Sequence, residues 1–293
     1  MNVSQGRLVA ARLQPELATG RYVARLAVRS LHAELVLYPK PGLVSLNDNG
    51  AHRDMNAETF VRSLFALRRY FADIALAGAQ GAPMAELRRI GVAAEARMMA
   101  ATCGVNTHRG AIFALGLLCA AAGRVRAERG SWSDAALRGV LARHWRRDLL
   151  AVLASPVTAP SHGQQAAARY GVGGARGEAI RGFPAVFEVA LPALRYALAR
   201  GADGERARLH AFFTLLAAVD DTNVLYRGGS AALDQVKQGA ARFLAAGSVF
   251  AGDWLQRAEA LHRRCSQQRL SPGGCADLLA AAWFVHQLQT EMR

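Results

Sequence analysis

Two adjacent carboxylates, Asp220 and Asp221, follow an apolar segment with helical periodicity. The C-terminal end of a helix disfavours negative charge, so these side chains need a compensating partner. Mg²⁺ is one such partner, because it binds a few carboxylates together with phosphate oxygens. Arg227, a few residues further on, is the other. The residues alone leave two hypotheses open, a Mg²⁺-phosphate site and an ordinary ion pair.

A polar loop at residues 39–55, PKPGLVSLNDNGAHRDM, collects further groups that could do chemistry. Its prolines and glycines predict a path rich in turns. Lys40 stands out because the chain almost always uses arginine, with Lys237 the one other lysine, and a compact lysine ammonium suits a phosphate oxygen. Asn49, His52 and Asp54 lie in the same loop. The alternative interpretation is an ordinary connecting loop with an Asx turn.

Two segments predict helix N-termini that could bind an anion. In GVNTHRGA (104–111) and SPGGCAD (271–277), a capping hydroxyl precedes small residues that leave first-turn N–H groups accessible. Simple helix capping would produce the same patterns. The residues that could line such sites are Asn106, Thr107, His108, Arg109, Ser271, Gly273 and Gly274.

The glycine-rich segment 170–178, YGVGGARGE, is not a dinucleotide-binding fingerprint. Arg176 occupies the place of the last glycine, and no strand precedes the segment. We expect a hinge or a loop that covers the substrate, with a merely flexible loop as the alternative.

Helical periodicity runs through almost the whole chain, and no segment alternates like a strand. We therefore expect one all-α globular domain over residues 1–293, with roughly ten helices and a site where loops and helix N-termini converge. Residues 155–163 are the best candidate for a break. The expected helices cover residues 17–37, 56–77 and 83–102, and further helices begin near Thr107, Ser133, Gln164, Phe183, Asp203, Ser230, Ala251 and Ser271.

Composition narrows the protein class. The 293 residues are 52% hydrophobic and carry a net charge of +14, which excludes global disorder. Apolar runs fall short of the roughly 20 residues of a membrane span, and the N-terminus lacks the apolar region of a signal peptide. We expect a cytoplasmic protein with no membrane partner. The four cysteines form no zinc pattern, and no nucleic-acid-binding signature accompanies the dispersed arginines.

Five motifs, in this order, resemble the triphosphoribosyl-dephospho-CoA synthase family. They are PKPGLV (39–44), DNGAHRDM (48–55), GVNTHRGA (104–111), DTNVLYRGG (221–229) and SPGGCADLL (271–279). This family makes the prosthetic-group precursor of the carrier proteins of citrate lyase and malonate decarboxylase. Cys275, where the family has serine, and Arg109, where lysine is common, are small departures that forbid assuming identical substrate affinity.

The resemblance implies a transferase with ATP and 3′-dephospho-CoA as substrates. The enzyme would move the triphosphoribosyl group of ATP to the ribose 2′-hydroxyl of dephospho-CoA and release adenine. The family makes an α-linked product from a β-linked donor, which suggests one inverting displacement. A second transferase would then attach the product to an acyl carrier protein. The segment VSLNDN (44–49) resembles the malonate decarboxylase branch, with citrate lyase as the alternative.

This reaction assigns expected roles to the motif residues. Breaking an N-glycosidic bond needs a base for the incoming hydroxyl, an acid for the departing adenine and a carboxylate near the anomeric carbon. Asp54 or His52 would activate the hydroxyl. Asp220 and the catalytically essential Asp221 would hold Mg²⁺ on the triphosphate. The expected substrate contacts are Lys40, Asn49, Asn106, Thr107, His108, Arg109, Arg227, Ser271, Gly273 and Gly274.

Two other functions compete with this one. A Mg²⁺-dependent hydrolase would cut an N-glycosidic bond with water as the acceptor. A basic helical adaptor would bind a carrier protein or nucleic acid without catalysis. The sequence leaves the oligomeric state open, with a homodimer as one alternative.

Overall fold

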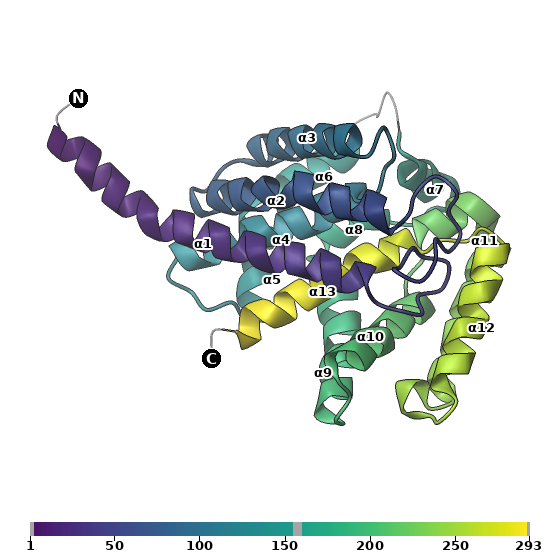
Figure 1. Cartoon of the computed structure of the whole chain (residues 1–293). Coiled ribbons are helices and arrows are strands. Elements are labelled where there is room, and N and C mark those ends of the chain that lie inside the picture. Colours follow the sequence, from purple (N-terminus) through teal and green to yellow (C-terminus); the bar gives the residue numbers. More distant parts are fainter. Residues whose placement is uncertain (1–2, 155–159, 292–293) are drawn as a thin grey trace.

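The computed structural model describes residues 3–154 and 160–291, and within these ranges it contains helices and no strand. The predicted all-α class is thus confirmed (Figure 1). Each helix is bounded as follows: α1 Val3–Leu35, α2 Ala57–Ala79, α3 Met84–Ala101, α4 Arg109–Ala127, α5 Asp134–His144, α6 Arg146–Ala154, α7 His162–Tyr170, α8 Gly174–Ile180, the π-helical η1 Ala185–Ala190, α9 Leu191–Ala199, α10 Gly204–Ala218, α11 Thr222–Ala245, the 3₁₀ turn η2 Ser248–Phe250, α12 Trp254–Gln267 and α13 Gly273–Thr290.

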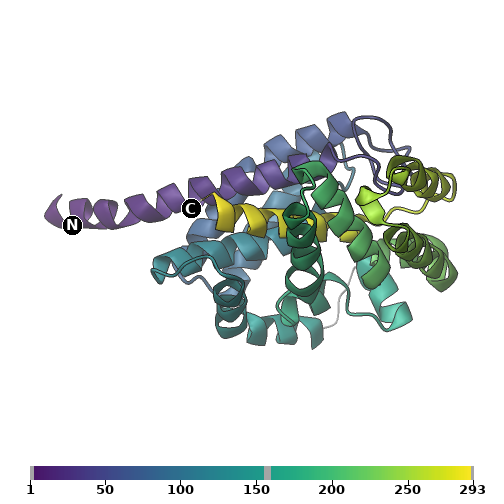
Figure 2. The same cartoon turned by 90° about the horizontal axis from the view of Figure 1, so that it is seen from below.

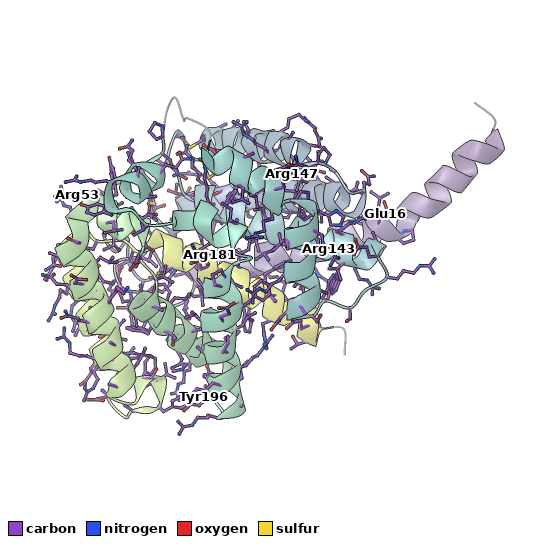
Figure 3. All side chains as sticks on the ribbon, turned by 180° about the vertical axis from the view of Figure 1, so that it is seen from behind. Glu16, Arg53, Arg143, Arg147, Arg181 and Tyr196 are labelled. Atoms are coloured by element: carbon purple, nitrogen blue, oxygen red, sulfur yellow. The ribbon has the colours of Figure 1, made fainter. Side chains whose placement is uncertain are left out.

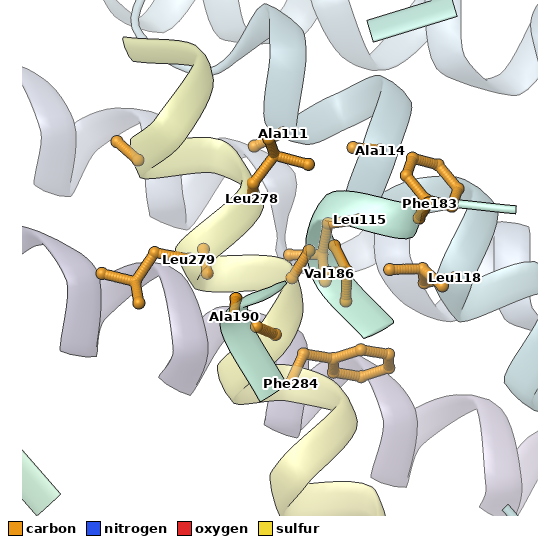
Figure 4. Close-up of a cluster of buried hydrophobic side chains, with 14 of the residues drawn as sticks. Ala111, Ala114, Leu115, Leu118, Phe183, Val186, Ala190, Leu278, Leu279 and Phe284 are labelled. Carbon is orange, nitrogen blue, oxygen red and sulfur yellow. The ribbon is translucent and has the colours of Figure 1, made fainter. Parts of the chain in front are cut away.

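Helices α4 and α13 form the centre of the molecule. Helix α13 packs against α1, α4, α10 and η1, and α4 also packs against α2. Figure 2 shows α13 running between α1 and the helices of the second half of the chain. Both helices are apolar on most of their circumference, as expected for elements surrounded by protein. Side chains that meet there include Leu115, Leu118, Phe183, Val186, Leu279 and Phe284 (Figure 4), all buried.

Helix α4 is also long and apolar enough to cross a membrane by composition alone. Most of its residues are buried inside the protein, and the core helix of a globular protein has the same composition. Its apolar character is therefore accounted for by its place in the core.

Helices α2 and α4 approach each other backbone to backbone. A Cβ atom at Gly78 would lie 2.1 Å from the carbonyl oxygen of Ala120, and one at Gly123 would lie 2.0 Å from that of Ala75. Only glycine fits at such distances. This close contact holds the C-terminal half of α4 against α2.

The loop between α1 and α2 is held against α12 and the segment that follows it. Gly42 has a φ of +68°, and a Cβ atom there would lie 1.9 Å from the carbonyl oxygen of Leu270. The His262 ring contacts the loop twice, with Nδ1 2.6 Å from the Lys40 carbonyl oxygen and Nε2 3.0 Å from the Asp48 carboxylate. The Tyr38–Pro39 peptide bond is cis. These contacts fix the position of His52 at the end of the loop.

The structure corrects three expectations about helix bounds. Segment 170–178 is not a single loop, because Gly171 ends α7 in a left-handed conformation and α8 begins at Gly174. Helix α11 begins at Thr222 rather than near Ser230, because Asp221 caps it and the chain continues through a kink at Gly229. The chain also forms the separate helix α6 after α5. Of the expected break at 155–163, residues 155–159 lie outside the described residues, and α7 begins at His162.

Positive charge is spread over the surface. In Figure 3, Arg53 lies at the opposite side of the face from Arg143 and Arg147, with Arg181 between them. Arg143 pairs with Glu128, and Arg181 pairs with Glu178. The arginines on this face therefore do not gather into a single patch.

Candidate active site

A cavity of about 150 Å³ lies where α1, the α1–α2 loop and the N-terminal ends of α2, α4, α11 and α13 meet. All five sequence motifs contribute lining residues, although they are far apart in the chain. The lining residues are Leu31, Glu34, Leu43, Val44, His52, Met55, Phe60, Asn106, Thr107, His108, Arg109, Gly110, Asn223, Arg227, Ser271, Gly273, Ala276, Asp277 and Ala280.

Asp221 joins two of the helix N-termini at this cavity. Its Oδ1 caps α11 by accepting from the backbone N–H groups of Asn223 at 2.8 Å and Val224 at 3.3 Å. Its Oδ2 accepts from the Cys275 N–H in the first turn of α13 at 2.8 Å. A Cβ atom at Gly274 would lie 3.0 Å from Oδ2, so glycine allows the close approach. Burial raises the pKa of Asp221, while the three backbone hydrogen bonds oppose the shift.

Asp277 joins α13 to α4 in the same way. A Cβ atom at Gly110 would lie 2.0 Å from Asp277 Oδ2, and the carboxyl accepts the backbone N–H of Ala111. Burial raises the pKa of Asp277 well above its ordinary value, and the charges of Glu34 and Asp221 raise it further. Asp277 also lines the cavity, so its carboxyl combines a structural contact with access to a ligand.

His52 stands at the side of the cavity, held between three polar partners. Its Nε2 lies 2.8 Å from Ser271 Oγ, and its Nδ1 lies 3.5 Å from both Asp54 Oδ1 and an Arg227 amino group. Burial lowers the pKa of His52, Arg227 lowers it further, and Asp54 opposes both effects. The ring is therefore neutral near pH 7 and can accept a proton. The Asp54 side chain itself is 64% exposed and does not line the cavity.

Thr107 and His108, at the start of α4, present buried polar atoms without a protein partner. His108 Nδ1 lies 2.6 Å from Ser63 Oγ, while His108 Nε2 and Thr107 Oγ1 are buried and unbonded in the described structure. Burial, with help from the Lys40 charge, lowers the pKa of His108 to about 3. Both residues line the cavity, so a bound ligand could satisfy these atoms.

Two arginines stand at the cavity with part of their hydrogen-bonding capacity engaged. Arg109 Nε donates to Glu95 at 2.6 Å, and its backbone N–H donates to the Asn106 side chain at 3.1 Å. Arg227 donates to the Arg269 carbonyl oxygen at 3.1 Å, and one of its amino groups lies 3.5 Å from His52 Nδ1. Both guanidinium groups are partly exposed to solvent and can reach an anion from there.

Lys40 and Asn49 lie outside the cavity lining. The Lys40 ammonium is buried behind the cavity, where it donates to the Glu34 carbonyl oxygen at 2.6 Å and to Glu34 Oε1 at 2.5 Å. Burial lowers the pKa of Lys40, and the Glu34 charge opposes this. Asn49 is exposed on the loop, and its carbonyl oxygen accepts from the His52 N–H. The Lys40 ammonium is thus paired with the Glu34 carboxylate, and Glu34 itself lines the cavity.

The adjacent carboxylates of Asp220 and Asp221 point to different partners. Asp220 is exposed and pairs with Lys237 at 2.7 Å, whereas Asp221 is buried and bound by backbone N–H groups. This arrangement does not fit a pair of carboxylates that share one Mg²⁺ ion. Within residues 3–154 and 160–291, no group of three or more His, Cys, Asp or Glu side chains is placed to hold a metal. Mg²⁺ stays a prediction, and no step below is derived through it.

Sequence reasoning missed three polar residues of the cavity, namely Glu34, Asn223 and Asp277. The last two lie inside motifs that were noted for their neighbours. The signal for Glu34 is weaker: it is an acidic residue in the last turn of a helix that is otherwise apolar there, where negative charge is unfavourable. Such a residue requires a nearby cation, which the structure identifies as Lys40.

Comparison with known proteins agrees with this site. Residues 20–293 match the family described as CitG, ATP:dephospho-CoA triphosphoribosyl transferase. A protein of Acinetobacter calcoaceticus named "Probable 2-(5''-triphosphoribosyl)-3'-dephosphocoenzyme-A synthase" is 37% identical over 92% of this chain and 91% of its own length. A Pectobacterium atrosepticum synthase of the same name, without "probable", is 42% identical over 89% and 87%.

A third relative, the probable synthase of Pseudomonas fluorescens, is 41% identical over 94% of both chains. No solved structure matches the chain. The family match covers all five motifs that surround the cavity. The chain is therefore an enzyme of the ATP:dephospho-CoA triphosphoribosyl transferase family.

Proposed function

We propose that this enzyme transfers the 5-triphosphoribosyl group of ATP to the ribose 2′-hydroxyl of 3′-dephospho-CoA and releases adenine. One observation carries the proposal: five motifs from distant parts of the chain line a single cavity. The names of the relatives agree with this reaction. In the proposed step the bond from C1′ to adenine breaks, and a bond from C1′ to the acceptor 2′-oxygen forms on the opposite face.

His52 is our candidate for the base that takes the proton from the 2′-hydroxyl. Its pKa is lowered by burial, so the ring is neutral and can accept a proton at neutral pH. Asp54, 3.5 Å from Nδ1, would stabilise the imidazolium that forms. Asp54 remains the alternative base, and a variant described below separates the two roles.

The triphosphate of the donor would lie at the more exposed side of the cavity. Arg109 and Arg227 supply positive charge there. The N-terminal ends of α4 and α13, with Thr107, Ser271 and Gly273, add hydroxyl and backbone N–H donors. Mg²⁺ would enter as the ion bound to ATP, as a part of the substrate.

The product would serve malonate decarboxylase. This finer proposal depends on the segment VSLNDN (44–49), and the citrate lyase pathway is the alternative. A separate transferase would attach the product to an acyl carrier protein. We place these reactions in the cytoplasm.

Mass spectrometry of a reaction with the protein, ATP, Mg²⁺ and 3′-dephospho-CoA tests the proposal. We expect adenine and a triphosphoribosylated product only when every component is present, with Mg²⁺ required. Adenine released without dephospho-CoA would instead establish a hydrolase. Folded protein that releases no adenine, but binds polynucleotides in a salt-sensitive way, would favour an adaptor.

A further inference from the structure

The cavity has two chemically different sides. Asn106 and Arg227 are exposed and Arg109 is half-buried, whereas Glu34 and most of the apolar lining are buried. Asp277 is half-buried as a residue, but its carboxyl is buried against Gly110 at the start of α4. The Glu34 carboxylate would repel the triphosphate, so the triphosphate belongs with the arginines. The buried side suits a neutral, flat group with polar edges.

The cavity as a whole is small, so only part of a substrate fits inside it. A cavity of about 150 Å³ is smaller than the roughly 300 Å³ at which pockets for whole ligands begin, so it accommodates one part of a nucleotide. Apolar contacts come from Leu31, Val44, Phe60 and Ala280. Among the parts of ATP, the adenine ring is the one that is uncharged and apolar on both faces.

We propose that adenine of the donor binds at the buried side and that Asp277 is the catalytic acid that protonates it as it leaves. This inference rests on the proposed function and deepens it. Asp277 lines the cavity, while its contact with the Ala111 N–H fixes the carboxyl at the start of α4. The Asp277 hydroxyl gives its proton to a ring nitrogen of adenine, and the electron pair of the broken C–N bond stays on the base.

The proton balance of the reaction closes with groups of this chain. The acceptor hydroxyl loses a proton to His52, and adenine gains the proton of Asp277. After the product leaves, His52 releases its proton to solvent and Asp277 takes one up. No further reactant is needed.

Glu34 is a poor alternative for the acid. Its carboxylate is paired with the buried Lys40 ammonium at 2.5 Å, so it is already bound to a cation of the protein. Asp277 instead faces the negative charges of Glu34 and Asp221, and its pKa lies well above the ordinary value. Asp277 therefore keeps its proton to a higher pH than an ordinary carboxyl does, whereas the Glu34 carboxylate, paired with Lys40, can stabilise positive charge on the ribose.

The variant Asp277→Asn tests the proposal, because asparagine still accepts the Ala111 N–H but cannot give a proton to adenine. With ATP we expect kcat to fall about 10²- to 10⁴-fold, the usual contribution of an acid catalyst. ATP methylated at N7 is the second donor, since its base leaves as a neutral molecule without a proton. With this donor we expect kcat of the variant to fall less than about tenfold, because the departing base needs no proton from an acid.

Asp253→Asn is the matched control, since Asp253 is an exposed residue that pairs with Arg257 and neither residue lines the cavity. It should match the unmodified protein with both donors. An equal loss of kcat with both donors in Asp277→Asn, or no loss with either, would overturn the role of Asp277 alone. If the unmodified protein forms no product from ATP, the proposed function fails as well.

The pH profile of kcat gives a second readout that does not depend on the methylated donor. We expect activity with ATP to fall at high pH as Asp277 loses its proton, and Asp277→Asn to lack this alkaline decline. The other titratable groups that line the cavity are His52, His108 and Glu34, together with the guanidinium groups of Arg109 and Arg227. An alkaline decline that persists in the variant would overturn the proposal.

Discussion

The Nε2 atom of His52 lies 2.8 Å from the hydroxyl oxygen of Ser271, although 218 residues separate them in the chain. This contact joins the loop after α1 to the start of α13 and sets the direction of the imidazole. Removing it should leave the ring free to turn away from the cavity. Ser271→Ala is therefore expected to lower kcat while the melting temperature changes little.

The pH dependence of activity separates the two candidate bases. His52 must be neutral to accept a proton, and its pKa is lowered by burial and by Arg227, so activity should decline only below pH 6.5. Asp54→Asn removes the charge that raises the pKa of His52. The loss of activity at acid pH should therefore move to still lower pH, with kcat largely kept. A loss of about 10²-fold or more across all pH values would make Asp54 the base.

Asp221→Ala should reduce stability. The variant loses the cap of α11 and leaves the Cys275 N–H without its acceptor. A lost cap costs about 1 kcal/mol and a buried unsatisfied donor about 1–3 kcal/mol, so unfolding in urea should show a loss of about 2–4 kcal/mol. Asp221→Asn keeps one acceptor and should lose less. An unchanged unfolding midpoint for Asp221→Ala would contradict the role of Asp221 in joining α11 to α13.

Stability should depend on the pH through Asp277. Its pKa is higher in the folded state than in the unfolded chain, so the folded state binds more protons between the ordinary carboxyl pKa of 3.8 and the raised value. The free energy of unfolding therefore falls as the pH rises through this window. Asp277→Asn lacks this effect, so its stability relative to the unmodified protein should be greater at pH 8 than at pH 4. Parallel stability curves would show that the Asp277 pKa is not raised.

Lys40→Met tests whether the lysine acts on phosphate or on Glu34. Removing one member of a buried ion pair costs about 3–5 kcal/mol, and we expect a loss of that order in urea unfolding. The double variant Lys40→Met, Glu34→Gln should recover part of it, because no buried charge is left unpaired. A stable Lys40→Met protein with only a raised KM for ATP would favour the predicted phosphate contact.

The helices and the place of the site could be predicted, and the partners of single side chains could not. Apolar periodicity locates the long helices, and helices begin close to the expected starts at Ser133 and Asp203. The predicted capping role of Thr107 and Ser271 is wrong, because Thr107 Oγ1 has no partner in the described structure and Ser271 Oγ contacts His52 instead. Short helices such as α8 were not predicted, because glycine dominates the segment.

Asp220 and Asp221 show why side-chain partners are harder to predict. They are neighbours in sequence, yet Asp221 caps α11 and Asp220 pairs with Lys237. Their partners differ because of the residue at which α11 begins. Lys40 was noticed for its residue type, but its partner Glu34 depends on how α1 ends against the loop.

Through its contact with Asp277, helix α4 would contribute to catalysis. When Asp277 gives up its proton, the new negative charge falls at the N-terminus of an apolar helix whose peptide dipoles add up to a positive end. The helix thus stabilises the conjugate base of the acid at the moment it forms. The alignment of α4 in the core would then reduce the free energy needed to release adenine, without any further charged side chain.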